Sequence, residues 1–181
     1  MVKYCPECGH GTERRIPEDD NRLRDICTNC GIIHYHNPKI IVGCLPEHEG
    51  RILLCKRAIE PRYGYWTLPA GFMENGETTA DGAARETMEE AAATATNLVL
   101  YRMFDVPHIN QVYVFYRCNI EDGKFGVGPE SLESNLYLPE ELPWDDLAFP
   151  VVRELLVEFI DDSRAGHFPV RHSVISRGGR R

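Results

Sequence analysis

The 181-residue sequence lacks a long hydrophobic run. Crossing a bilayer takes about 20 consecutive apolar residues, and the longest run here, from Lys39 to Leu45, is only as long as a β-strand. The N-terminus also lacks the charged and then apolar pattern of a secretory signal, and cysteines begin already at Cys5. We therefore expect a cytoplasmic protein that has no contact with a membrane.

Net positive charge is missing as well, since the formal net charge is −8 at pH 7. Proteins hold nucleic acids mainly by neutralising phosphates with Lys and Arg. The basic end of the chain, with Arg177, Arg180 and Arg181, is too short to reverse this balance, and we expect it to be a solvated tail. The charge argues against a nucleic acid as the main partner, and none is expected.

The sequence also lacks an even, regularly spaced set of cysteines of the kind that forms a disulfide framework. Four of its seven cysteines form two close pairs, and Cys44, Cys55 and Cys118 lie singly in strand-like runs. This usage fits a reducing compartment, in which a free cysteine behaves as a small buried hydrophobic residue. We expect these three thiols to lie in the core.

The amino-acid composition of the chain changes near residue 38. Residues 1–37 are rich in Cys, Gly, Asn, Pro and charge, and they contain few apolar segments. A piece of this size cannot bury enough surface to fold without a staple. The sequence therefore predicts a small stapled module at 1–37, a main domain at 38–165 and a C-terminal tail at 166–181.

The main domain alternates strand-like and helix-like segments. Two apolar runs joined by a turn that ends in Gly50 predict a β-hairpin. The Ala-, Glu- and Arg-rich segment from Glu77 predicts a helix with Thr78 or Thr79 as its N-cap, and Pro150 begins a second one. Strands are predicted at 39–46, 51–57, 98–106, 111–120 and 132–138, and helices at 77–93 and 150–162. This order indicates a sheet covered by helices, an α/β (α+β) fold.

The two cysteine pairs have the spacing of a metal site. Cys5-Pro-Glu-Cys8-Gly and Cys27-Thr-Asn-Cys30-Gly are two C-x-x-C-G knuckles. Two residues between cysteines let both thiolates point at one centre, and four thiolates complete a closed tetrahedral Zn²⁺ shell. Disulfides or a redox pair are the alternatives, but no βαβ pattern surrounds either knuckle. We expect a structural Zn²⁺ ion bound by Cys5, Cys8, Cys27 and Cys30.

The first predicted helix concentrates acidic residues on one face. Glu86 lies three residues before Glu89 and four before Glu90, and such spacings place side chains together. A cluster of carboxylates suits hard cations such as Mg²⁺. Arg85 follows Glu77 by eight residues, and a pair between them would tie the helix to the preceding loop. The alternative is an ordinary solvated, Glu-rich amphipathic helix.

The whole segment resembles the signature of the Nudix hydrolases, G-x5-E-x7-R-E-U-x-E-E-x-G-U, in which U is a bulky apolar residue. Six positions match, and they are Gly71, Glu77, Arg85, Glu86, Glu89 and Glu90. Thr87, Ala92 and Ala93 depart from the pattern. Ala in place of Gly at residue 92 costs on the order of 1 kcal/mol if a left-handed conformation is needed there, and otherwise the helix runs on through Ala93.

The resemblance implies a Nudix α/β/α sandwich with a mixed sheet, and it implies a metal-dependent hydrolase. Glu86, Glu89 and Glu90 would be catalytic and would bind Mg²⁺ or Mn²⁺, with the Gly71 carbonyl completing the shell. Gly71, Glu77 and Arg85 would support the signature structurally. Bound divalent ions neutralise a pyrophosphate and lower the pKa of a bound water, which suits hydrolysis of nucleoside-diphosphate-linked compounds.

Similarity beyond the signature points to the zinc-ribbon Nudix hydrolases related to FAD and ADP-ribose pyrophosphatases. It rests on the ribbon and on the segments 36–43, 53–57, 66–71 and 128–133. The expected reaction converts FAD to FMN and AMP, or ADP-ribose to AMP and ribose 5-phosphate. NADH pyrophosphatases are the rival, but their Ser-Gln-Pro-Trp-Pro-like marker is absent from Phe104–Tyr113. A non-catalytic nucleotide sensor or a zinc-ribbon binding module is a further alternative, and a homodimer is compatible with all of them.

Other residues are candidates for the rim of this site. Tyr63, Tyr65 and Trp66 precede the signature and could stack on adenine or flavin. Arg57 ends a predicted strand and could meet a phosphate. Glu130 and Glu133 follow a Gly-rich loop, from which an auxiliary acid/base could orient the attacking water. Core packing, a surface ion pair and a solvated loop are the respective alternatives.

Overall fold

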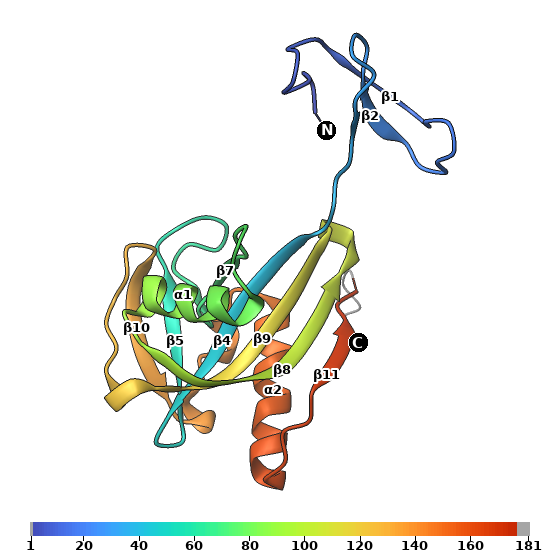
Figure 1. Cartoon of the computed structure of the whole chain (residues 1–181). Coiled ribbons are helices and arrows are strands. Elements are labelled where there is room, and N and C mark those ends of the chain that lie inside the picture. The colour runs from blue at the N-terminus through green and yellow to red at the C-terminus, as the bar shows by residue number, and fades with distance from the viewer. Residues whose placement is uncertain (1, 177–181) are drawn as a thin grey trace. The chain divides into compact units, whose positions relative to one another are not determined.

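The computed structural model describes residues 2–176 and divides the chain into two compact units, Met1–Asn37 and Pro38–Arg181. The smaller unit is a three-stranded antiparallel sheet of β1 (Thr12–Arg15), β2 (Arg24–Cys27) and β3 (Ile33–His34), with β2 in the middle (Figure 1). Among its described residues, the buried apolar ones are Cys5, Pro17, Ile26 and Cys27. So small a core leaves the cysteine cluster as the staple that this unit needs.

The larger unit is built on a mixed eight-stranded sheet with the main order β10-β5-β4-β9-β8-β11, in which β6 also pairs with β5 and β7 with β4. The central pair, β4 and β9, is parallel, whereas β8 and β9 are antiparallel. The strands are β4 (Lys39–His48), β5 (Arg51–Arg57), β6 (Trp66–Thr67), β7 (Ala70–Phe72), β8 (Ala95–Val106), β9 (Gln111–Ile120), β10 (Ser131–Tyr137) and β11 (Arg171–Val174). The predicted α/β fold with a mixed sheet is confirmed.

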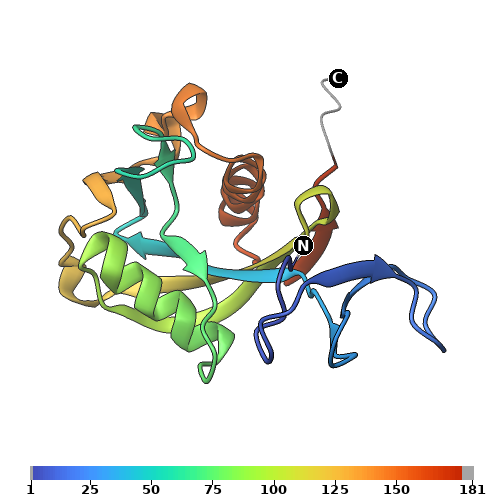
Figure 2. The same ribbon diagram turned by 90° about the horizontal axis from the view of Figure 1, so that it is seen from above.

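Two helices cover the two faces of this sheet (Figures 1 and 2). Helix α1 (Thr79–Ala91) packs Ala83 against Val42 and Cys44 on one face. Helix α2 (Pro150–Ala165) buries Leu155 and Leu156 with the aromatic residues of the other face. Short 3₁₀ turns connect the rest, η1 (Pro107–Ile109), η2 (Glu121–Gly123), η3 (Pro139–Glu141) and η4 (Trp144–Asp146). The predicted sandwich and both helices are thus confirmed.

The predicted hairpin forms only at its turn. Strands β4 and β5 pair at Glu47–Ile52 and His48–Arg51, and they then separate. Strand β7 pairs with β4 at residues 41–43, and β6 pairs with β5 at residues 55–56. The segment 66–72 therefore joins the sheet through both strands, and this places Gly71 directly on the central strand.

The C-terminal segment departs from the expected tail, because β11 adds to the sheet in parallel with β8. The Arg171 guanidinium binds both carboxylate oxygens of Asp162 on α2, at 2.5 and 2.6 Å, and the Tyr101 hydroxyl donates to the same carboxylate at 2.7 Å. This bidentate pair joins a buried carboxylate to a partly exposed guanidinium and fixes the C-terminal segment, for which the short polar sequence had predicted no structure. The expected solvated tail at Arg177–Arg181 lies outside the described residues. No helix of the described chain is long and apolar enough to cross a membrane.

Candidate functional site

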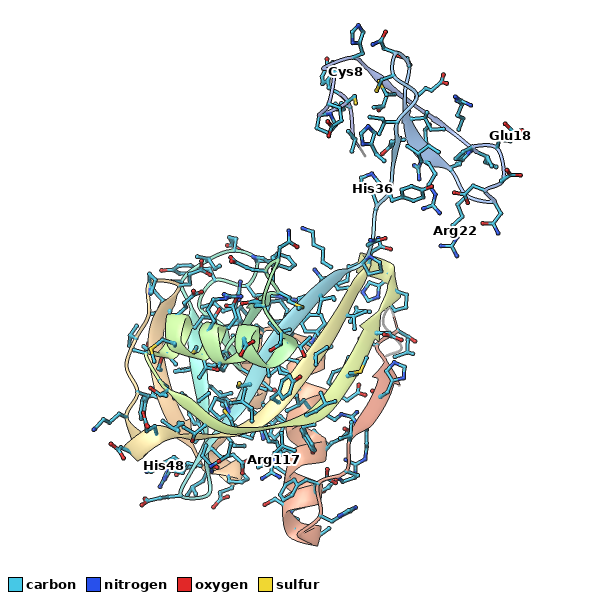
Figure 3. All side chains as sticks on the ribbon, in the orientation of Figure 1. Cys8, Glu18, Arg22, His36, His48 and Arg117 are labelled. Carbon is cyan, nitrogen blue, oxygen red and sulfur yellow. The ribbon has the colours of Figure 1, made fainter. Side chains whose placement is uncertain are left out.

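The smaller unit gathers the four cysteines of its two knuckles, including Cys8 (Figure 3). Their sulfur atoms all lie within 4.8 Å of one another, with Cys8–Cys27 at 3.4 Å, Cys8–Cys30 at 3.6 Å and Cys5–Cys30 at 3.8 Å. Sulfurs bound 2.3 Å from a tetrahedral zinc are about 3.8 Å apart, so this set fits Zn²⁺. In the described part of the chain, no other group of three or more His, Cys, Asp or Glu side chains brings its ligand atoms together in this way.

Helix α1 presents its acidic residues in two different environments. The Thr78 side chain caps the helix by accepting from the Asp81 amide, and the Asp81 carboxylate accepts in return from the Thr78 amide. From this start, Glu86 and Glu90 point inward and are only 8% and 7% exposed. Glu89 faces solvent, so the structure brings two of the three predicted ligands into the interior.

The two buried carboxylates converge on the segment Ala70–Gly71. The Ala70 amide donates to a Glu90 oxygen at 3.2 Å. At Gly71, a built Cβ atom would lie 2.4 Å from the Glu86 carboxylate. Only a residue without a side chain leaves this carboxylate in place, which explains the glycine that opens the signature. Two carboxylates beside this backbone segment offer oxygen donors, and these suit Mg²⁺ or Mn²⁺.

Arg85 joins the acidic residues to the loop before the helix. Its guanidinium donates to both Glu77 oxygens at 2.9 and 3.0 Å, to Glu86 at 2.7 Å and to Glu89 at 3.1 Å. It also donates to the Phe72 carbonyl at 3.1 Å. The predicted Arg85–Glu77 pair is therefore present, and it ties the helix to the loop that contains Gly71.

The electrostatics separate the structural from the buried carboxylates. The hydrogen bonds from Arg85 lower the pKa of Glu77 to about 2, so this carboxylate stays ionised. Burial raises the pKa of Glu90 to about 8, and the charge of Glu86 adds to this effect. Burial also raises the pKa of Glu86, against the opposing effect of Arg85. Desolvated carboxylates of this kind are typical of functional sites.

The end of helix α1 resolves one departure from the Nudix signature. The helix stops at Ala91, and Ala92 takes a left-handed conformation with φ 46° and ψ 37°. The Ala92 amide donates to the Met88 carbonyl at 2.9 Å. The position therefore has the backbone shape for which the signature uses glycine, although this chain has alanine there.

The aromatic candidates before the signature divide by burial. Trp66 is only 7% exposed and packs edge-on against Tyr137 at 5.3 Å between ring centres. It is therefore a core residue and not a surface for stacking a base. Tyr63 is 55% exposed, and Tyr65 lies under the Arg62 guanidinium at 5.6 Å. Tyr63 therefore lies on the surface of the loop, whereas Tyr65 is half-buried.

Arg57, which was predicted to bind a phosphate, is the last residue of β5. Its Nε donates to the Pro61 carbonyl at 2.9 Å, and its guanidinium lies 5.1 Å from the centre of the Phe149 ring. Burial raises the pKa of both Glu90 and Tyr113, and the positive charge of Arg57 opposes this effect. Phe149, the N-cap of α2, and Tyr113 on β9 were not predicted, because no local pattern connects them with Arg57.

The two candidates for an auxiliary acid/base differ in their surroundings. The Glu133 carboxylate accepts from the Lys56 ammonium at 2.8 Å. Glu130, in contrast, lies in the turn that begins at Gly128, and the Gly128 amide donates to the Glu90 carbonyl at 3.0 Å. The backbone therefore brings Glu130 to the end of α1 that carries Glu90.

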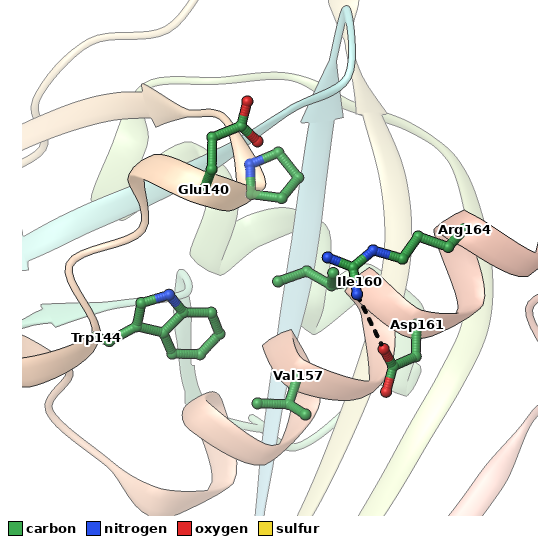
Figure 4. A pocket seen from close by; sticks show the side chains of 7 residues that line it. Glu140, Trp144, Val157, Ile160, Asp161 and Arg164 are labelled. Atoms are coloured by element: carbon green, nitrogen blue, oxygen red, sulfur yellow. Dashed lines mark ion pairs between the residues drawn. The ribbon is translucent and has the colours of Figure 1, made fainter.

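A separate groove of about 320 Å³ lies between the 3₁₀ turns η3 and η4 and helix α2 (Figure 4). Arg164 forms an ion pair with Asp161 at its edge, at 3.6 Å. None of the predicted site residues contributes to its lining, which consists of Pro139, Glu140, Trp144, Val157, Ile160, Asp161 and Arg164. The groove therefore holds none of the carboxylates on which the site depends.

Comparison with known proteins agrees with this geometry. The family model of the Nudix N-terminal zinc ribbon matches residues 3–36, and that of the NUDIX domain matches residues 37–158. The crystal structure of a NUDIX hydrolase from Nitrosomonas europaea is 47% identical, with a TM-score of 0.94, and the match covers 97% of this chain and 100% of that one. An ADP-ribose pyrophosphatase from Streptococcus suis, at 23% identity and a TM-score of 0.59 over 75% of this chain and 99% of that one, shares the fold.

Curated relatives include two proteins named NAD-capped RNA hydrolase NudC. That of Haemophilus influenzae (strain PittGG) is 28% identical over 91% of this chain, and that of Salmonella heidelberg (strain SL476) is 31% identical over 90%. The chain spans only 62% of the length of each. Their name runs against the expectation from charge that no nucleic acid is involved.

Proposed function

The chain belongs to the Nudix hydrolase family, with the family's zinc ribbon at its N-terminus, and on that premise we propose that it hydrolyses the pyrophosphate bond of a dinucleotide that contains AMP. The first substrate class is NAD(H), free or at the 5′ end of an RNA. Free NAD(H) gives AMP and a nicotinamide mononucleotide, and a capped RNA gives a nicotinamide mononucleotide and an RNA that begins with a 5′-monophosphate. The observation that supports this most is the convergence of the buried Glu86 and Glu90 carboxylates on Ala70–Gly71. The relatives named NAD-capped RNA hydrolase supply the substrate class.

Each residue has a separate task in this proposal. Glu86, Glu90 and the Gly71 carbonyl would hold Mg²⁺ or Mn²⁺, with Glu89 on the exposed side of the helix. When bound, these ions would neutralise the pyrophosphate and lower the pKa of a bound water. Glu130 accepts a proton from the attacking water, because its turn begins at Gly128, which donates to the Glu90 carbonyl, whereas the Glu133 carboxylate is paired with Lys56.

Two further groups position the substrate and the helix. Arg57 binds a phosphate oxygen, since the Pro61 carbonyl and the Phe149 ring hold its guanidinium in place. Arg85 and Glu77 keep α1 fixed against the loop before it. The zinc held by the four cysteines is structural, because a closed shell of four thiolates leaves no position for a substrate.

FAD and ADP-ribose form the second candidate substrate class. The observation in its favour is the segment between β8 and β9, where NADH pyrophosphatases have a Ser-Gln-Pro-Trp-Pro-like motif. Here the 3₁₀ turn Pro107–Ile109 occupies this position without that motif. Both classes share an AMP half joined through a pyrophosphate, so the same carboxylates and the same Arg57 serve either of them.

The test is to incubate the native protein with NADH, NAD-capped RNA, FAD and ADP-ribose, each with Mg²⁺ and with Mn²⁺, and to identify products by mass. The Glu90→Gln variant should lose activity, whereas Glu140→Gln, a matched change on the exposed turn η3, should keep it. AMP from NADH, or a nicotinamide mononucleotide and a 5′-monophosphorylated RNA from capped RNA, supports the first class, and AMP from FAD or ADP-ribose alone supports the second. A native protein that cuts none of them contradicts hydrolysis and favours a nucleotide-sensing module. An active Glu90→Gln variant contradicts the carboxylate assignment.

A further inference from the structure

The loop of residues 124–130 is fastened to the end of helix α1 that holds Glu89 and Glu90. The Gly126 amide donates to the Ala91 carbonyl at 2.6 Å, and the Gly128 amide donates to the Glu90 carbonyl at 3.0 Å. The last carbonyls of a helix have no partner within the helix itself. The loop supplies these partners, so its position is set by the backbone of α1.

Gly128 makes the closest of these contacts. A Cβ atom built on it would lie 1.7 Å from the Glu89 carbonyl oxygen and 2.7 Å from the Glu89 carbonyl carbon. Both are backbone atoms of a helix, so neither can swing aside. At Gly126 the nearest atom to a built Cβ is the Ala92 methyl at 3.3 Å, a contact that small shifts relieve. The two glycines of one loop thus form a matched pair that differs in available space.

The chain reaches Glu130 in a single turn from Gly128. The Ser131 amide donates to the Gly128 carbonyl at 3.1 Å, which closes a β-turn with Pro129 and Glu130 at its two central positions. Proline at the first of these fixes φ for such a turn. The Glu130 carbonyl also accepts from the Ala58 amide at 2.8 Å. The backbone of Glu130 is therefore held from two sides, and one of them begins at Gly128.

We propose that Gly128 is a positioning residue: its lack of a side chain seats the loop against the Glu89–Glu90 backbone and thereby fixes Glu130 at the end of α1 that carries Glu89 and Glu90. The inference rests on the proposed hydrolysis and adds a residue that touches neither substrate nor metal. A methyl group at residue 128 must lift the loop away from the helix. Glu130 then moves with the turn, whereas Arg57 and the ligands on α1 keep their own supports.

The experiment measures kcat and KM for Gly128→Ala, Glu130→Gln, the double variant and Gly126→Ala. NADH is the substrate, or ADP-ribose if the native protein leaves NADH uncut. Glu130→Gln should lower kcat about a hundredfold, as expected for loss of a general base. Gly128→Ala should lower kcat at least about tenfold with KM within about twofold, because substrate contacts remain. The double variant should be no slower than Glu130→Gln, and Gly126→Ala should match the native enzyme.

The outcomes separate this inference from the proposed function. Losses that multiply in the double variant show that Gly128 does not act through Glu130, and they overturn the proposal. So does an active native enzyme whose Glu130→Gln variant keeps full kcat, although hydrolysis itself then stands. A native protein without activity rejects the hydrolysis first. If Gly128→Ala does not fold, Pro129→Gly takes its place: it loosens the turn and should slow the native enzyme but not the Glu130→Gln variant.

Discussion

Replacing Ala92 by glycine should stabilise the protein. Ala92 has φ 46° and ψ 37°, and a non-glycine residue in this left-handed region costs roughly 1–2 kcal/mol. Glycine removes this cost but loses about 0.4–1 kcal/mol through the larger freedom of the unfolded chain. The side chain of Ala92 is exposed, so no buried area is lost. The net gain in the free energy of unfolding is about 1 kcal/mol.

The assay is thermal and urea unfolding of the native protein, of Ala92→Gly and of Ala84→Gly. Ala84 lies in the interior of the same helix, where glycine costs about 1 kcal/mol relative to alanine. The same chemical change should therefore raise the melting temperature by about 2–4 °C at residue 92 and lower it by a similar amount at residue 84. Activity of Ala92→Gly should stay at the native level. If both variants lose stability, the left-handed conformation at Ala92 is not what limits this helix end, and the reasoning is refuted.

Three further predictions follow from the other supports of the fold and the site. Cys30→Ser should release zinc and abolish the dispersed amide NMR signals of residues 2–37. A ribbon that stays folded without zinc would contradict the claim that this unit needs the metal to fold. Asp162→Asn should lower the free energy of unfolding by about 2 kcal/mol at pH 7. Since Arg171 holds the pKa of Asp162 below its ordinary value, urea titrations should show this difference intact above about pH 4 and lost as the pH falls through the lowered pKa, never growing in acid. Arg57→Ala should raise KM about tenfold, the loss of one charged hydrogen bond, whereas Arg62→Ala on the same loop should leave KM near the native value.

The features that could be predicted from the sequence are those with a local pattern. The two cysteine knuckles, the Thr78 N-cap and the spacing of Glu86 and Glu90 each lie within a few residues, and the structure places them as expected. Strand β9 has the predicted bounds for the same reason, since its apolar run ends at turn residues on both sides.

The features that were not predicted depend on contacts between distant segments. Trp66 is a core residue because β6 joins the sheet beside β5, and nothing near Trp66 in the sequence indicates this pairing. Glu130 and Glu133 could not be distinguished before Lys56 was seen to bind Glu133. Strand β11 is held against the rest of the domain because Arg171 binds Asp162, which also accepts a hydrogen bond from Tyr101, 61 residues away in the sequence.

The roles of the glycines around helix α1 also depend on contacts between distant segments. The sequence alone does not distinguish a glycine that is needed for its φ angle from one that is needed because a side chain would not fit. Gly76 has φ +90° and nothing within 4 Å of a built Cβ, so it serves the turn itself. Gly71, Gly82 and Gly128 have ordinary φ angles but no room, with the Glu86 carboxylate at 2.4 Å, a Glu77 oxygen at 2.5 Å and the Glu89 carbonyl at 1.7 Å from the built Cβ. Each of these three contacts involves an acidic residue of the signature. Gly71 and Gly82 thus leave room for the carboxylates of Glu86 and Glu77, and Gly128 lets its loop approach the helix backbone. This close packing holds the two desolvated carboxylates in one geometry, whereas a looser site would let them turn to solvent.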